Sequence, residues 1–285
     1  MGLQMVCAPT TLEYVTSHHV GVKCTAISFC RLFAVAHESG LRAFNTDFKP
    51  YLGQGRNQTP QKSPDIGCFA ESVTSVDYFD SNSVWYVGPE AQSGDRVIFN
   101  QRVQHGACNY RHKFSSKRND TASCLAANKS CVVVSYPSNK TIIILYLMDN
   151  TYEHITLKYF PNSCRFIPNS TNEFIVSNEL GIAYYKISAK EGEETTCIRQ
   201  WFCDQAPDTH GLAFLKDVNI LAHSVKRKAV YAVSKLGALI AVFENKEIGK
   251  ATAGDICVWE DDQAGKFLYL PSSEHQAIIQ FKIVY

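Results

Sequence analysis

Two clusters of basic residues in the sequence could bind negatively charged groups. One cluster is the run Lys226, Arg227 and Lys228. The other mixes basic with aromatic residues and comprises Tyr110, Arg111, Lys113, Phe114, Lys117 and Arg118. Lys and Arg side chains can neutralise phosphates, and Tyr or Phe rings can stack on the bases of single-stranded RNA. The alternative interpretation of each cluster is a solvated charged loop, with the aromatic rings packed inside the fold.

The nine histidines give little evidence for an active site. Asp208 and His210 are close in sequence, but no G-x-S-x-G motif or other nucleophile context accompanies them. His37, His223 and His275 flank equivalent turns in the repeats described below, so they should point towards one face. Three histidines around the opening of a ring could bind a metal ion. Polar residues at strand ends are the more ordinary explanation. We therefore predict no catalytic residue, no metal site and no bound cofactor.

The eleven cysteines include no C-x-x-C pair. Structural zinc sites draw ligands from such close pairs, so a zinc module such as a RING is not indicated. A secreted disulfide framework is one interpretation, and five N-x-S/T sequons would suit it. However, Cys124, Cys131, Cys164 and Cys257 lie in apolar segments, where free cysteine behaves as a small buried hydrophobic residue. This placement favours reduced cysteines in a cytoplasmic protein.

The composition indicates a folded domain without bulk charge. The chain has 285 residues, of which 45% are hydrophobic, and its formal net charge is +1. A disordered chain would be poorer in apolar residues and richer in net charge. Net charge alone cannot hold this chain to nucleic acid or anionic lipid, although a local basic patch could. No apolar run reaches the roughly 18 residues of a membrane-spanning helix, so we expect no membrane association.

Six segments share one layout of three short apolar strands separated by polar turns. The first strands are TAISF (25–29), TSVDY (74–78), ASCLA (122–126), NSCRF (162–166), HGLAF (210–214) and GDICV (254–258). They recur about every 46 residues, and fourth strands are visible at 152–160, 194–202 and 238–245. This spacing is typical of the four-stranded blades of a β-propeller. The sequence predicts one all-β domain over residues 1–285, a six-bladed β-propeller; a β-sandwich is the alternative.

The two ends of the chain are predicted to meet in the last blade. The sixth repeat stops after its third strand, so we expect residues 11–20 to supply the fourth. Leu12 to Ser17 should pair beside Ala277 to Val284, which removes an exposed strand edge. Residues 47–70 contain three prolines and three glycines, and they predict a long loop in place of a regular fourth strand in blade one. Such a loop is either a binding surface or a disordered insertion, and we favour the latter.

Strand order determines which basic residues share a face. Strands alternate in direction, so each second-to-third-strand turn lies on the same face as each link to the next blade. Lys226 to Lys228 should therefore share a face with the link at 115–120. The two clusters come from nearly opposite blades, so they form one surface only for a ligand that crosses the central opening.

The fifth and sixth repeats resemble NHL repeats. HGLAFLKDVNILAHSVKRKAVYAVSKLGALIAVFEN (210–245) has a Gly-aliphatic first strand, an Asp turn, an apolar second strand, a basic turn and a Gly turn, and 254–283 has a similar layout. The resemblance implies a propeller like those at the C-terminus of TRIM-NHL proteins, which bind RNA or protein partners. The usual Asp-x-x-Asn-x-Arg turn is absent. WD40 repeats fit less well, because Trp259 follows a first strand whereas WD dipeptides close a third strand.

One segment is similar to a different class of propeller. SCRFIPNSTNEFIVSNELGIAYYKIS (163–188) resembles a blade of lactonase-type seven-bladed propellers, which implies an enzyme that opens a sugar lactone with Glu179 as a candidate acid. Our leading prediction is instead a non-enzymatic, monomeric binding module with a protein partner. RNA binding through the basic clusters and a lactonase-like hydrolase in the central opening are the alternatives.

Overall fold

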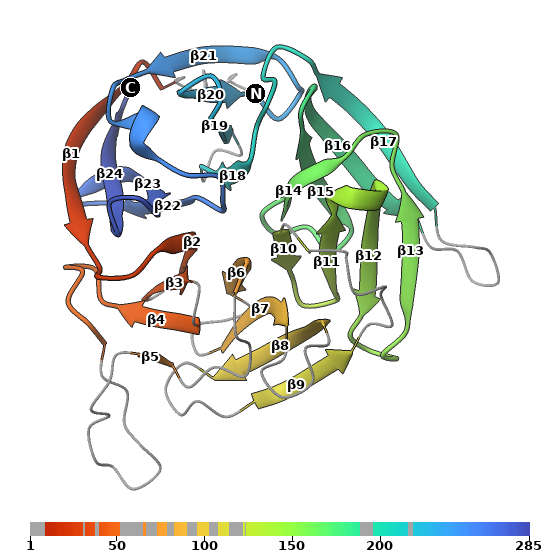
Figure 1. Cartoon of the computed structure of the whole chain (residues 1–285). Coiled ribbons are helices and arrows are strands. Elements are labelled where there is room, and N and C mark those ends of the chain that lie inside the picture. Colours follow the sequence, from red (N-terminus) through yellow and green to blue (C-terminus); the bar gives the residue numbers. More distant parts are fainter. Residues whose placement is uncertain are drawn as a thin grey trace, which may run out of the picture.

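The chain forms a ring of six four-stranded antiparallel sheets around a central axis (Figure 1). The computed structural model describes residues 9–30, 32–37, 40–51, 65–66, 73–78, 83–89, 96–102, 108–113, 122, 124–188, 196–215 and 219–285. Almost all regular structure in these residues is β-strand, apart from two single-turn 3-10 helices, η1 (Pro137–Asn139) and η2 (Ile248–Lys250). The predicted all-β, six-bladed propeller is confirmed.

Each blade runs from an inner strand at the axis to an outer strand at the rim. Blade one is β2 (Cys24–Phe29), β3 (Phe33–His37), β4 (Gly40–Phe44) and β5 (Asp65–Ile66). Blade two is β6 (Ser75–Tyr78), β7 (Ser83–Pro89), β8 (Arg96–Arg102) and β9 (Cys108–Lys113). Blade three is β10 (Cys124–Ala127), β11 (Cys131–Tyr136), β12 (Thr141–Tyr146) and β13 (Tyr152–Thr156).

The second half of the ring repeats this order and ends with the N-terminal strand. Blade four is β14 (Pro161–Phe166), β15 (Glu173–Asn178), β16 (Gly181–Ser188) and β17 (Thr196–Cys203). Blade five is β18 (Gly211–Phe214), β19 (Ile220–Ser224), β20 (Ala229–Val233) and β21 (Leu239–Glu244). Blade six is β22 (Cys257–Asp261), β23 (Gly265–Ser272), β24 (Ala277–Val284) and β1 (Thr11–His19).

The hydrophobic core is divided among the blade interfaces. Six clusters of buried side chains lie between neighbouring blades, one for each interface around the ring. A middle strand is therefore covered on both faces, which explains why all six residues of β11 are buried and why its sequence is a continuous apolar run. The outer strand β13 alternates between exposed and half-buried residues. Continuous apolar runs in the sequence thus mark the two middle strands of a blade, such as β11 and β12.

The N-terminal strand closes the ring as predicted. β1 pairs antiparallel with β24, with Leu12 opposite Ile283 and His19 opposite Ala277. The Leu12 side chain is buried and joins the core between blades five and six. This pairing covers the edge of β24 and connects the two ends of the chain.

Two details of the sequence prediction were wrong. Blade one does have a fourth strand, the short β5, which pairs Ile66 with Leu41 and Asp65 with Arg42. The rest of the predicted loop, residues 52–64 and 67–70, lies outside the described residues. Trp259 lies inside the inner strand β22 rather than after it, because that strand continues to Asp261.

Neither a spanning helix nor a disulfide is present in the described part of the chain. Its helices are single turns, and none has the length and apolar character needed to cross a membrane. Six free thiols are buried in the described part of the chain: Cys24, Cys124, Cys131, Cys164, Cys203 and Cys257.

Candidate functional site

The face formed by the second-to-third-strand turns and the blade-to-blade links carries the first candidate site. This face is turned towards the viewer in Figure 1, where the coiled ribbons of η1 and η2 lie in front. Both helices belong to these connections, because η1 joins β11 to β12 and η2 joins β21 to β22. Turns between first and second strands lie on the opposite face.

The predicted basic run forms the turn between β19 and β20. The ammonium of Lys226 lies 3.4 Å from one carboxylate oxygen of Asp208, and Nε of Arg227 lies 3.5 Å from the other. The two basic side chains remain 72% and 58% exposed, so these pairs leave most of each charged group in water. Such exposed pairs contribute only about 0.2–1 kcal/mol each. The third residue, Lys228, has a positive φ of 52° and lies with its side chain near Gly249.

Asp208 connects this turn to an exposed leucine in blade four. The backbone N–H of Asp208 donates to the carbonyl of Glu179 in the turn between β15 and β16. That turn is rigid, because the Asn178 side chain accepts the N–H groups of Leu180 and Gly181 at 2.8 and 3.1 Å. A side chain on Gly181 would meet the backbone of Cys203, so glycine is required there. The turn thereby presents Leu180, which is 46% exposed, in a fixed position.

Aromatic and basic side chains continue the same surface towards blade three. Phe160, in the link between β13 and β14, is 39% exposed, and the ammonium of Lys140 lies 4.6 Å from its ring centroid. The ammonium of Lys158 lies 5.3 Å from the ring of Tyr159. Tyr159 in turn stacks on Phe202 with ring centroids 5.6 Å apart. These contacts hold the link against the outer strand of blade four.

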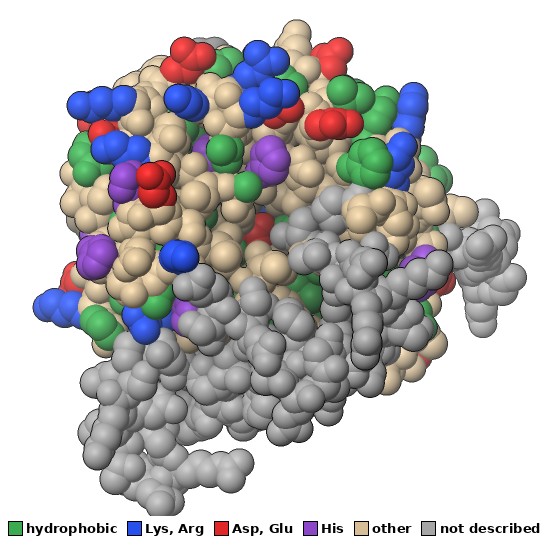
Figure 2. All heavy atoms as spheres, viewed as in Figure 1, with side chains coloured by type: hydrophobic (Ala, Val, Ile, Leu, Met, Phe, Trp, Pro, Cys, Tyr) green, Lys and Arg blue, Asp and Glu red, His purple; other side chains and the backbone are tan. Residues whose placement is uncertain are grey.

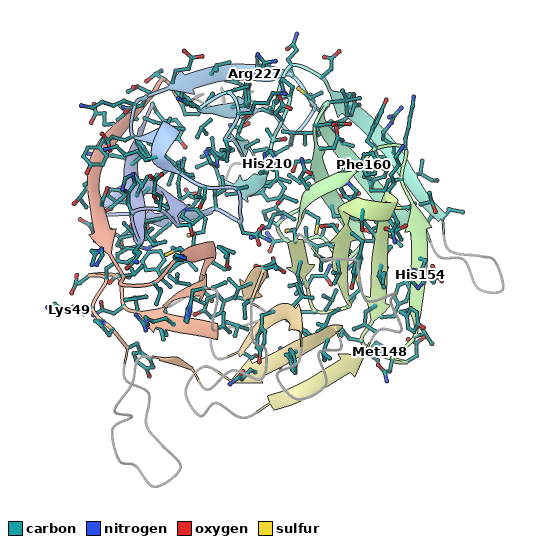
Figure 3. All side chains as sticks on the ribbon, in the orientation of Figure 1. Lys49, Met148, His154, Phe160, His210 and Arg227 are labelled. Atoms are coloured by element: carbon teal, nitrogen blue, oxygen red, sulfur yellow. The ribbon has the colours of Figure 1, made fainter. Side chains whose placement is uncertain are left out.

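Together these residues form one surface over blades three to five. We call it the basic strip and define it by Lys140, Lys158, Phe160, Leu180, Lys226 and Arg227. In Figure 2, blue side chains lie along the upper edge, where Figure 3 labels Arg227. Other blue side chains lie at the right beside a group of green ones, where Figure 3 labels Phe160. The connections that carry the strip hold five basic residues, Lys140, Lys158, Lys226, Arg227 and Lys228, and three acidic ones, Glu179, Asp204 and Asp208. The strip is basic with exposed apolar side chains inside it.

The other predicted basic cluster is described only in part. Tyr110, Arg111 and Lys113 belong to β9, the outer strand of blade two. Phe114, Lys117 and Arg118 lie outside the described residues. Only the Lys226–Lys228 half of the predicted site is therefore placed on a surface.

The axis of the ring is filled by a polar cluster around Asp255, which precedes β22. The Cys124 thiol donates to Oδ1 of Asp255 at 2.9 Å, and the Ser163 hydroxyl donates to the same atom at 3.3 Å. The Ser75 hydroxyl donates to Oδ2. One carboxylate from blade six thus reaches inner strands of blades two, three and four across the axis. We call these residues, with Arg165, the axial cluster.

Arg165 provides the positive charge of the axial cluster. Its guanidinium lies 3.4 Å from Asp255 and donates to the carbonyls of Leu125 at 2.8 Å and Cys164 at 3.3 Å. Burial raises the pKa of the Asp255 carboxyl well above its usual range, and the positive charge of Arg165 acts against this shift. The guanidinium is satisfied by acceptors inside the fold, so it stabilises the closed axis.

The comparisons with known proteins identify a fold and no family. No protein-family model and no curated protein matches the chain. A solved β-propeller domain of Cps50 (Swd1) from Myceliophteria thermophila is 11% identical, with a TM-score of 0.58 over 92% of this chain and 84% of that chain. The WD40 β-propeller domain of Doa1 is 12% identical, with a TM-score of 0.57 over 96% of this chain and 97% of that chain. At this identity the similarity shows the propeller fold alone.

A pocket lies on the face opposite to the basic strip. Its volume is about 460 Å³, and it is lined by the ends of the inner strands of blades two to four and by the first-to-second-strand turns of blades three and four. Asp77, Tyr78, Arg165 and Phe166 line it together with the turn residues Lys129 and Ile167. We call it the axial pocket, because Arg165 connects it to the axial cluster.

The three histidines considered above as a possible metal site do not form one in the described structure. The described residues contain no group of three His, Cys, Asp or Glu side chains that could hold a metal ion. His37 and His223 are buried at the ends of β3 and β19, whereas His275 is exposed in the turn between β23 and β24. Burial lowers the pKa of His223 to about 4, and the neighbouring His210 adds to this shift. His210 itself lies near the centre of the ring (Figure 3).

Sequence reasoning missed the axial cluster and half of the basic strip. Ser75, Ser163, Arg165 and Asp255 all fall in predicted first strands, and polar residues recurring in strands that line an axis are a usable signal. Phe160 and Leu180 carry no such signal. Their importance depends on exposure, which a sequence pattern does not report for single apolar residues in turns.

Proposed function

We propose that this propeller is a non-enzymatic protein-interaction module, and that the basic strip binds an acidic segment of a partner protein. The main support is that two exposed apolar side chains, Phe160 and Leu180, lie among basic side chains on this face. The loops that carry them are fixed by contacts within the fold. A partner segment with an apolar anchor flanked by Asp or Glu matches this arrangement. Rigid loops bind with little ordering entropy, which favours such recognition.

Several contacts favour a protein over RNA as the occupant. The ring of Tyr159 stacks on Phe202, so it is already engaged within the fold and is not free to stack on a base. Leu180 is an exposed aliphatic side chain, which suits an apolar side chain of a protein better than a nucleotide base, because bases stack on aromatic rings. The resemblance of blades five and six to NHL repeats is compatible with a protein partner.

The free thiols support the cytoplasm as the location of this interaction. Six of the described cysteines, Cys24, Cys124, Cys131, Cys164, Cys203 and Cys257, are buried free thiols. Such thiols persist in reducing compartments.

A random peptide library displayed on phage tests this proposal. Peptides selected on the wild-type protein should be enriched in Asp and Glu around one apolar residue. They should lose affinity for a Lys158→Glu/Lys226→Glu variant. The matched control is Lys49→Glu/Lys235→Glu, which changes the same charge in exposed connections of the opposite face. Selection of neutral or basic peptides, or single-stranded RNA binding that depends on Lys158 and Lys226, would contradict the proposal.

A further inference from the structure

The axial pocket contains a carboxylate that has no ionic partner. Asp77 ends the inner strand of blade two, and within the described part of the chain no Lys, Arg or His nitrogen lies within salt-bridge distance of its oxygens. Its carboxylate is fixed in place, since Oδ1 accepts the Tyr78 N–H at 3.0 Å and Oδ2 accepts the Ala127 N–H at 3.0 Å. The Ser28 hydroxyl also donates to Oδ1 at 3.3 Å. Asp77 is therefore a preorganised acceptor, with one lone-pair site on Oδ2 left to bind a ligand.

The one buried cation near Asp77 is already balanced. Arg165 forms its ion pair with Asp255, and two backbone carbonyls accept its NH1 protons. Burial raises the pKa of Asp77 as the largest effect, and the positive charge of Arg165 acts against this shift. A carboxylate in this position gains most from a positive group that enters the pocket.

The walls of the axial pocket suit a long side chain with a charged end. Tyr78 and Phe166 supply aromatic surface, and Ile167 and Pro168 supply aliphatic surface. The Tyr78 hydroxyl is buried and has no hydrogen-bond partner among the described residues, so it can accept a hydrogen bond from a ligand. Aromatic rings beside a carboxylate bind cations through both charge and the ring quadrupole. A volume of about 460 Å³ is within the usual range for pockets that bind one small group.

We propose that the axial pocket binds a basic side chain of a peptide, with a guanidinium or ammonium on Asp77 and the aliphatic stem against Phe166 and Ile167. This site lies on the face opposite to the basic strip, so it is independent of the function proposed above. A propeller with both sites would hold an acidic segment on one face and a basic side chain on the other.

Calorimetric titration with two blocked amino acids tests the proposal. The probes are N-acetyl-arginine methylamide and N-acetyl-citrulline methylamide, which have nearly the same shape but differ in charge. The arginine probe should bind saturably and at least ten-fold more tightly than the citrulline probe. Equal affinities, or the lack of saturable binding by the arginine probe, would overturn the proposal.

Two variants and one control assign the binding to this pocket. Asp77→Asn should weaken binding of the arginine probe at least ten-fold. Lys129→Glu changes an exposed residue at the rim and should tighten binding roughly two- to five-fold, even if Asp77→Asn does not fold. Asp262→Asn, in an exposed turn of the same face, should leave affinity unchanged. If Lys129→Glu weakens binding, or N-acetyl-glutamate methylamide binds more tightly than the arginine probe, the pocket takes an anion and the proposal is wrong.

Discussion

Lowering the pH should destabilise the fold through His223. This residue is fully buried in β19, and burial lowers its pKa from 6.5 to about 4. As the pH falls below 6.5, the unfolded chain takes up a proton that the folded chain cannot accept until about pH 4. Stability is therefore lost across this interval. The loss at pH 5 relative to pH 7.5 is about 2 kcal/mol, and it reaches about 3.4 kcal/mol below pH 4.

Urea denaturation at pH 7.5 and pH 5, followed by tryptophan fluorescence, measures this loss. The wild-type protein should lose about 2 kcal/mol more than His223→Gln, which removes the titrating group. Asp77 and Asp255 have raised pKa values and act with the opposite sign, but they are present in both proteins and cancel in the comparison. His275→Gln, at an exposed position, should behave like the wild type. If His223→Gln shows the same pH dependence as the wild type, the reasoning is refuted.

Three further predictions concern the closed ring. Deleting residues 1–20 removes β1 and exposes β24, so cooperative thermal unfolding should be lost; a cooperatively folded deletion variant would show that closure is dispensable. Asp255→Ala leaves the buried Arg165 without its partner and should lower the free energy of unfolding in urea by about 3–5 kcal/mol, whereas Asp262→Ala should not change it. A loss below about 1 kcal/mol would mean that the axial cluster does not stabilise the ring. Gly181→Ala forces a side chain against the Cys203 backbone and should lower the free energy of unfolding by about 1–3 kcal/mol. An unchanged free energy of unfolding would contradict the close approach of Gly181 to Cys203.

The fold could be predicted because the propeller repeats its local signals. Each blade contributes apolar runs for its middle strands, which are covered on both faces, and polar turns at regular spacing. The pairing of Leu12 with β24 followed from counting strands in the last blade. The short β5 could not be predicted, because only two residue pairs hold it to β4 and no apolar run marks it.

The candidate sites could be predicted only in part. The alternation of strand direction predicted that Lys226 and Arg227 lie in a second-to-third-strand turn, as the structure shows. Their proximity to Leu180 depends on the hydrogen bond from Asp208 to Glu179, which the sequence does not predict. The axial cluster depends on contacts between residues up to 180 positions apart, such as Ser75 and Asp255. Local periodicity carries no information about which side chains meet across the axis.

The most direct test of the proposed function is the affinity of one selected acidic peptide for three proteins, measured by fluorescence anisotropy at constant salt. Relative to the wild type, Lys158→Glu/Lys226→Glu should bind at least about ten-fold more weakly, because two attractive charges become repulsive. The opposite-face control, Lys49→Glu/Lys235→Glu, should bind within about two-fold of the wild type. Equal affinities for all three proteins, or a larger loss in the control, would contradict the assignment of the basic strip as the binding surface.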